Sequence, residues 1–183
     1  MTSSTVPDSA SAMDAPLNAF SQCHAGILSQ LEAMEELPTL IAAAAQARVV
    51  ASDTLSIFHH AVFEHHAEEE GELFPAVLRS ATPGEERDRV QALQERLTRE
   101  HRTLEALWKR IEPAVTAGSK GKPADIDSAV VEELVRAYKA HARFEEQEFL
   151  PLAQVILGRD GNHMAALGLS LHMRHVPQPV GYI

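Results

Sequence analysis

HHAEEEGELFP, residues 65–75, places two histidines and four glutamates within eight residues, at a point where the flanking sequence predicts a buried helix. A second stretch, HARFEEQEFLP at residues 141–151, aligns with it without a gap at an offset of 76. The paired residues are His65 with His141, Glu69 with Glu145, Glu70 with Glu146, Glu72 with Glu148, and Pro75 with Pro151. The charged run is therefore one copy of an internal repeat.

The repeat extends beyond these two stretches. His24 lies 77 residues before His101, and each of the two histidines begins a similar apolar series along the chain. A repeat of this length indicates that one supersecondary unit occurs twice. The chain is predicted to contain two helical hairpins built on one plan.

The pattern of apolar residues has the period of a helix almost throughout. Alanine, leucine and glutamate are abundant and aromatic residues make up only 5%, which favours helices over strands. Proline is expected to end the second helix before Pro75 and the fourth at Pro151. The predicted helices are residues 17–36, 40–71, 85–117 and 126–150, followed by a short one at 162–175. The expected fold is all-α, an up-down-up-down four-helix bundle with a short C-terminal helical extension.

The domain boundaries follow from composition. Residues 1–15 are small, polar and interrupted by proline, which predicts a disordered leader. Residues 16–158 would form the bundle, and residues 159–183 a C-terminal helical extension and tail.

Charge and cysteine content exclude several classes of protein. The net charge of −10 and the lack of a basic cluster argue against nucleic-acid binding. No apolar run approaches the roughly 18 residues of a membrane span, so no membrane association is expected. Cys23 is the single cysteine, and the N-terminus has no secretory pattern, so a reducing, cytoplasmic location is expected.

Helical geometry predicts where the repeated acids and histidines point. Residues four apart lie on the same helix face, and the faces of His65 with Glu69 and of His141 with Glu145 also carry apolar residues. His24 and His101 lie in the apolar stripes of their own helices. His65 is chosen over His66 because His65, like His141, lies ten residues before its proline. The remaining histidines of this region, His59, His60 and His66, are expected on the surface.

Four imidazoles and two carboxylates directed at one bundle axis need a counter-charge. An ionised carboxylate that is buried without a partner costs several kcal/mol after relaxation. No inward lysine or arginine is expected to neutralise the pair, so a buried metal is predicted, bound by imidazole and carboxylate ligands. Six protein ligands exceed the four of a tetrahedral zinc site, and the number fits two metals.

These residues resemble the hemerythrin-like, or HHE cation-binding, domain family. The matching elements are His24, His65-x3-Glu69 before Pro75, Glu100-His101, and His141-x3-Glu145 before Pro151. The resemblance implies a four-helix bundle that holds two iron ions as a non-haem di-iron centre with solvent-derived oxo or hydroxo bridges and carboxylate bridges. It implies further that Glu69 and Glu145 bridge, that His24 and His65 bind one iron, and that His101 and His141 bind the other.

The chain also departs from the pattern of the circulating oxygen carriers in this family. Those proteins have a second histidine one turn from the position of His101, where this chain has Leu97 and Glu105. The second iron site would then have an open position or one filled by Glu105 or water, and either would change its redox potential and affinity for dioxygen.

Three kinds of function stay open. The chain could bind or sense O₂, NO, iron or redox state, or be a stress-defence enzyme acting on peroxide or NO. The third alternative is a structural bundle that binds zinc. A ferritin-type site fits the sequence poorly, because no histidine has a glutamate three residues before it.

Overall fold

A computed structural model of the chain describes the backbone of residues 9–159 and the side chains from residue 22 onward. The described part is helical and contains no strand, which confirms the all-α prediction. The chain divides into two compact units, Met1–Ala47 and Arg48–Ile183, and each is described by itself. The predicted helix at 162–175 and all but residue 159 of the predicted extension lie outside the described residues.

The secondary structure of residues 9–159 consists of α-helices and three short π-helical turns, which are labelled η. The α-helices are α1 (Ser9–Glu35), α2 (Leu37–Ile57), α3 (Phe63–Glu68), α4 (Phe74–Ser80), α5 (Glu85–Ser119), α6 (Ser128–Phe144) and α7 (Leu150–Leu157). The π-turns are η1 (Phe58–Val62), η2 (Glu69–Leu73) and η3 (Glu145–Phe149).

The unit up to Ala47 consists of α1 and the first part of α2. A turn at Glu36 joins the two helices, and the Glu36 carbonyl accepts a hydrogen bond from the Leu40 N–H at 3.0 Å. α1 begins at Ser9 and so includes the second half of the predicted leader. Within this unit its apolar side chains, such as Ile27 and Leu31, are exposed.

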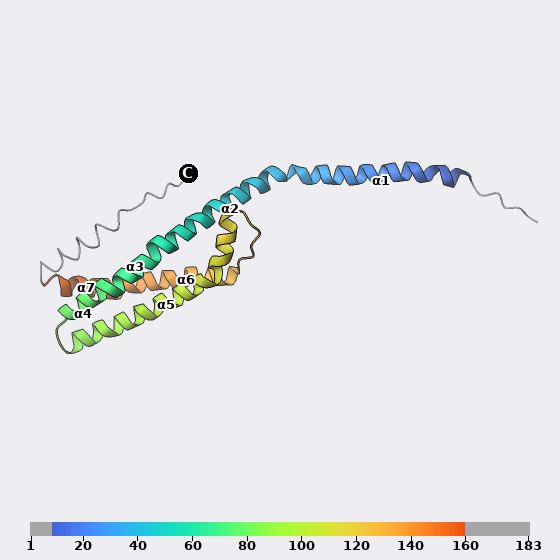
Figure 1. The fold of residues 1–183 in the computed structure, drawn as a ribbon. Coiled ribbons are helices and arrows are strands. Elements are labelled where there is room, and N and C mark those ends of the chain that lie inside the picture. The colour runs from blue at the N-terminus through green and yellow to red at the C-terminus, as the bar shows by residue number, and fades with distance from the viewer. Residues whose placement is uncertain (1–8, 160–183) are drawn as a thin grey trace, which may run out of the picture. The chain divides into compact units, whose positions relative to one another are not determined.

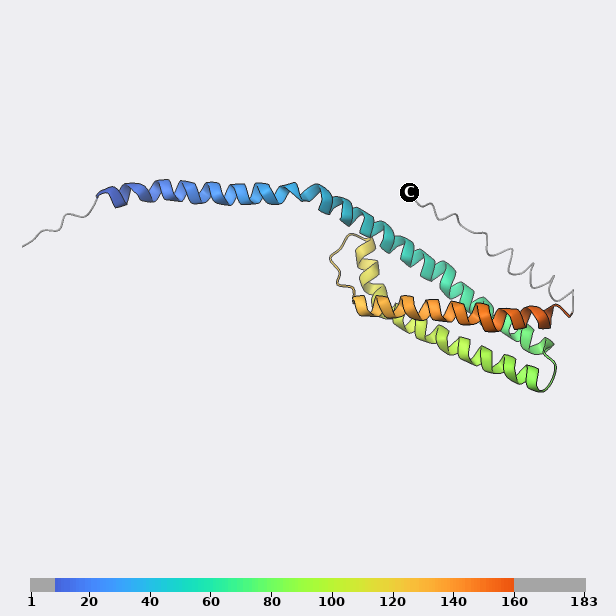
Figure 2. The same ribbon diagram turned by 180° about the vertical axis from the view of Figure 1, so that it is seen from behind.

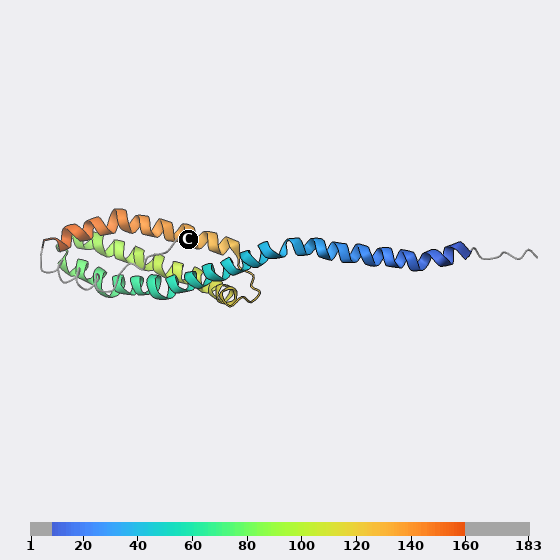
Figure 3. The same ribbon diagram turned by 90° about the horizontal axis from the view of Figure 1, so that it is seen from above.

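In the unit from Arg48 onward, three helical runs lie side by side and alternate in direction (Figure 1, Figure 2 and Figure 3). The first run ends with α4, the second is α5, and the third comprises α6, η3 and α7. α5 packs against α6, and α4 packs against both α5 and α7. The C-terminal part of α5 bends (Figure 1); Pro113 lies inside this helix and removes a backbone donor.

Local contacts determine where α5 and α6 begin. Gly84, just before α5, has a φ of 100°, a conformation that favours glycine. The predicted start of the third helix at residue 85 is thus confirmed. α6 begins after Asp127, whose Oδ1 accepts hydrogen bonds from the N–H groups of Ala129 at 3.0 Å and Val130 at 3.3 Å. This is the usual arrangement of an N-cap residue.

The predicted ends at Pro75 and Pro151 are wrong, because the helices continue to Ser80 and Leu157. A π-turn precedes each proline. The Phe74 N–H bonds to the Glu69 carbonyl, and the Leu150 N–H bonds to the Glu145 carbonyl, five residues back in both cases. The π-turn shifts the backbone hydrogen-bond register just before the proline. The missing N–H and the ring of the proline therefore do not end the helix. Both copies of the repeat share this bulge.

The interior of this unit has two apolar clusters. One lies around Phe74, Val90 and Phe149, and the other around Trp108 and Leu134. Between them along each helical run lies a polar layer, defined as the five buried residues His66, Glu69, His101, His141 and Glu145. The apolar clusters on either side keep water away from this layer.

The prediction that no apolar run approaches the length of a membrane span is wrong, because one helical run of the described chain, Leu37–Ser80, is long and apolar enough to cross a bilayer. Length and composition alone are weak evidence for a membrane span.

Candidate metal centre

The polar layer places three imidazoles side by side. His66 and His101 stack with ring centroids 3.9 Å apart and an interplanar angle of 5°. The His141 ring stands edge-on to both, with its centroid 4.9 Å from that of His101 and 5.8 Å from that of His66. One ring nitrogen of each histidine can be chosen so that all three lie within 4.8 Å of one another, which is close enough to bind one metal ion.

Two carboxylates and a fourth imidazole form an adjacent group, in which ligand atoms of His65, Glu69 and Glu145 also lie within 4.8 Å of one another. The Nε2 atom of His65 is 3.3 Å from Glu69 Oε1, and the His65 side chain is 41% exposed. Glu69 Oε2 approaches His101 Nε2 to 3.2 Å, so the two groups are contiguous.

The π-turns explain why both carboxylates are buried. Glu69 begins η2 and Glu145 begins η3, so each acid stands at the point where the helix widens. Single π-turns inside α-helices occur frequently at functional sites. The two halves of the chain therefore direct equivalent acids inward by the same backbone device.

The two carboxylates have opposite shifts in pKa. Burial, and then the neighbouring Glu69 charge, raise the pKa of Glu145 to about 8. Burial also acts to raise the pKa of Glu69, but contacts with His101, Glu145 and His65 outweigh it and lower that pKa. Two buried carboxylates side by side do not both ionise without a cation. At neutral pH the metal-free pair holds one proton, on Glu145.

The buried imidazoles also differ in basicity. Burial and the neighbouring imidazoles lower the pKa of His66 to about 3, and burial lowers the pKa of His141. Burial acts the same way on His101, but Glu69 and Glu70 on its two sides outweigh it and raise its pKa. His66 is therefore neutral at physiological pH and offers a lone pair.

Five buried atoms in this layer have no hydrogen-bond partner. They are the Nε2 atoms of His66, His101 and His141 and both carboxylate oxygens of Glu69. The 3.2 Å approach of His101 to Glu69 lacks the alignment of a hydrogen bond. Among the described residues, no lysine or arginine pairs with Glu69 or Glu145. Orphaned buried donors and acceptors are costly, and metal ions bound at the two groups would give these atoms partners. Imidazole nitrogens and carboxylate oxygens suit iron and zinc.

Five of the six predicted ligands, all except His24, lie in these two groups. His24 lies on α1, where its side chain is exposed, and belongs to the unit that ends at Ala47. Its role as a ligand stays a prediction. Glu105 lies on the outer side of His66, 3.5 Å from Nδ1, and does not reach the inner nitrogen atoms.

The expected surface position of His66 is wrong, because this residue is only 2% exposed. His59 and His60 are exposed, as predicted. A signal for His66 was present in the sequence: the buried residues of this run, Val62, His66, Glu69, Leu73 and Val77, follow helical spacing. The gapless alignment of the two repeat copies drew attention away from this spacing, because it pairs His141 with His65. His66 lies nine residues before Pro75, whereas His141 lies ten before Pro151. The extra turn η1 has no counterpart in the regular helix α6, so the two copies do not share one register throughout.

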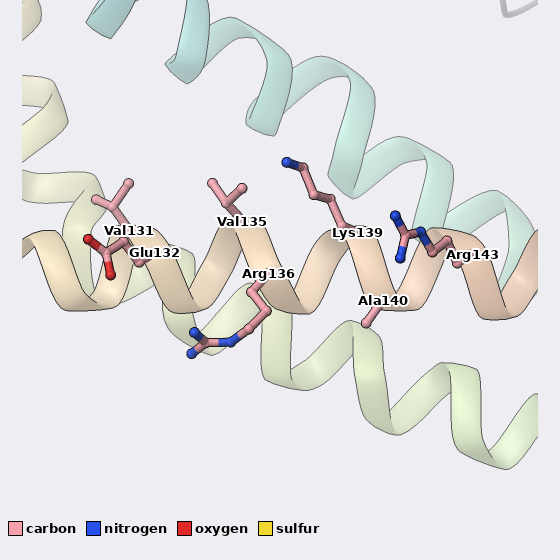
Figure 4. Close-up of a pocket in the computed structure, with 7 residues that line it drawn as sticks. All are labelled: Val131, Glu132, Val135, Arg136, Lys139, Ala140 and Arg143. Atoms are coloured by element: carbon pink, nitrogen blue, oxygen red, sulfur yellow. The ribbon is translucent and has the colours of Figure 1, made fainter.

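Two open depressions mark the surface of this unit, and neither is lined by the polar layer. One, of about 500 Å³, follows α6 and is lined by apolar and basic side chains, including Arg136, Lys139 and Arg143 (Figure 4). The other, of about 560 Å³, lies beside Phe74 and reaches Glu70, which contacts His101 from outside. Among the described residues, the polar layer lines neither of these two depressions, and His65 at its edge is 41% exposed.

Comparison with known proteins agrees with this chemistry. The hemerythrin family, described as the hemerythrin HHE cation binding domain, matches residues 15–153. An uncharacterized protein of Haemophilus influenzae is 25% identical over 158 residues, which cover 82% of this chain and 88% of that protein. No solved structure matches the chain.

Proposed function

Because the chain belongs to the hemerythrin HHE cation-binding domain family, we propose that its polar layer binds two iron ions and reacts with or senses O₂, NO or peroxide. The observation that supports this proposal is the convergence of five orphaned donor and acceptor atoms in a buried layer. When bound, a di-iron centre with a solvent-derived bridge supplies redox chemistry toward these small molecules.

The candidate ligands form two metal-binding positions. The three imidazoles of His66, His101 and His141 form a nitrogen-rich position, and His65 with the two carboxylates forms an oxygen-rich one. Glu69 lies between the two positions and can bridge them. His24 stays in the proposed ligand set on the strength of the sequence repeat, and a His24→Ala variant tests it.

One carboxyl group of the layer also holds a proton. Glu145 holds one at neutral pH in the metal-free protein, because burial and Glu69 raise its pKa to about 8. Tyr138, whose ring centroid lies 6.0 Å from that of His141, has its pKa raised by burial and by the charges of Glu69 and Glu145. The tyrosine hydroxyl thus stays protonated beside the layer and can donate a hydrogen bond there.

A second candidate function is a zinc-binding structural bundle. The three imidazoles, whose ligand atoms lie within 4.8 Å of one another, and Glu69, 3.2 Å from His101, could supply the four ligands of a structural zinc site. In that case the layer would stabilise the fold without redox chemistry.

Metal analysis of anaerobically purified protein separates these candidates. About two irons per chain, with a new charge-transfer band after exposure to air, NO or peroxide, supports the di-iron proposal. Stoichiometric zinc and an unchanged spectrum would reject it in favour of the structural bundle. Catalytic turnover of peroxide or NO then distinguishes an enzyme from a sensor.

A further inference from the structure

On the outer side of the polar layer, glutamates contact the buried histidines in a regular pattern. Each of the three buried imidazoles presents Nδ1 to a different glutamate. These glutamates, called the outer carboxylates below, are Glu70, Glu100 and Glu105, with side chains 20–28% exposed. The Nδ1 to oxygen distances are 2.7 Å for His101 with Glu70, 3.1 Å for His141 with Glu100, and 3.5 Å for His66 with Glu105.

A carboxylate at Nδ1 determines the state of the neutral imidazole. An ionised carboxylate only accepts hydrogen bonds, so Nδ1 must carry the proton and Nε2 keeps its lone pair. In all three histidines Nε2 is the buried atom without a partner. In each neutral ring, the outer carboxylate therefore favours the tautomer that binds a metal from the inside.

Two arginines of α5 in turn hold the outer carboxylates. Arg102 donates from Nη2 to Glu70 and from Nη1 to Glu105, the latter at 2.9 Å. Arg96 donates from Nε to Glu100 at 2.8 Å, and its guanidinium carbon lies 3.4 Å from the centre of the Phe144 ring. Each of the three buried imidazoles is thus the inner member of a hydrogen-bonded series arginine–glutamate–histidine. Arg102 belongs to two of these series and Arg96 to one.

From this geometry, and given the proposed metal-binding function, we infer that Arg102 and Arg96 are positioning residues of the metal centre. Arg102 fixes His66 and His101 through Glu70 and Glu105, and Arg96 fixes His141 through Glu100. The planar guanidinium of Arg102 has the fork of donors needed to hold two carboxylates at once. A lysine at this position would supply the charge without the fork.

The test compares Arg102→Gln and Arg96→Gln in the full-length chain, loaded with zinc as a diamagnetic probe. NMR measures the exchange of each imidazole Nδ1 proton with water. Arg102→Gln is expected to accelerate exchange at least tenfold at His66 and His101 and to leave His141 unchanged. Arg96→Gln is expected to give the reverse pattern. Equal acceleration at all three rings, or none, overturns the inference.

Zinc affinity gives an independent readout. Loss of a group that orients metal ligands lowers metal affinity roughly 10–100-fold. Arg102→Gln should fall in this range, whereas Arg89→Gln, which removes an exposed pair with Glu148, should stay within twofold of the unmodified chain. Arg102→Lys should recover only part of the loss, and full recovery would show that charge alone is sufficient and refute a positioning role.

The same experiment keeps the two proposals apart. If the unmodified chain binds neither zinc nor iron, the proposed function itself fails. If it binds zinc while Arg102→Gln leaves affinity and proton exchange unchanged, only the positioning role fails.

Discussion

Metal binding to this chain should depend steeply on pH, because one inner carboxylate must give up a proton. The pKa of Glu145 is about 8 in the metal-free protein, so this carboxyl is mostly protonated at pH 7. A metal needs the ionised form, and binding therefore releases about one proton per chain below pH 8. His66, with a pKa of about 3, is already neutral and releases none.

The magnitude follows from the ionised fraction of Glu145. With a pKa of about 8, roughly 1% of these carboxyls is ionised at pH 6 and roughly 50% at pH 8. Zinc affinity should therefore rise roughly 50-fold over this range, or about 2.3 kcal/mol. The raised pKa of His101 acts in the same direction and can only steepen the rise.

The assay is chelator competition at several values of pH from 6 to 8, corrected for the titration of the chelator. Glu145→Gln serves as the comparison, because an amide cannot release the proton; this variant should bind more weakly at pH 8 and show a much flatter curve. A change of less than fivefold in the unmodified chain would refute the reasoning. So would an equally steep curve in Glu145→Gln.

Three further outcomes follow from the same geometry. His66→Ala should lower metal stoichiometry and melting temperature while His60→Ala, an exposed neighbour, changes neither; equal metal content in both would rule out His66 as a ligand. Leu97→Ala, at a fully buried position beside the layer, should cost roughly 2–5 kcal/mol in urea unfolding, and a cost below about 1 kcal/mol would contradict the packing. The metal-free protein should lose about 2 kcal/mol between pH 6.5 and 8, because the folded pKa of Glu145 is raised and its stabilising contribution is lost as pH rises; a rise in stability over this range would show that the sign is wrong.

The fold class and most of the site could be predicted because they depend on periodicity and on a repeated motif. The burial of His101 and His141 followed from their place in apolar stripes. The repeat also predicted equivalent positions for Glu69 and Glu145, which the structure places at the start of equivalent π-turns. These features are local, and short-range geometry determines them.

The rest depends on backbone register, which residue types do not report. Pro75 and Pro151 have the usual appearance of helix ends, yet a preceding bulge lets the helix pass through them. The burial of His66 was missed because the gapless alignment pairs His65 with His141, whereas His66 lies three residues before its acid and His141 four before. The arginines that hold the outer carboxylates were also missed. Arg96–Glu100 and Arg102–Glu105 are local pairs within α5, but their link to the buried histidines exists only after α5 packs against the neighbouring helical segments.

The paired bulges at Glu69 and Glu145 make chain length itself a part of the site. A π-turn holds one more residue than the α-helical path it replaces, so removing a single residue from either would restore the regular spiral. The helical segments on either side of the turn would keep their facing, because the α-helical path between them spans the same stretch with one residue fewer. The widened turn that buries the acid would be lost even though no ligand had been altered. Tolerance to substitution elsewhere in these two segments should therefore exceed tolerance to deletion.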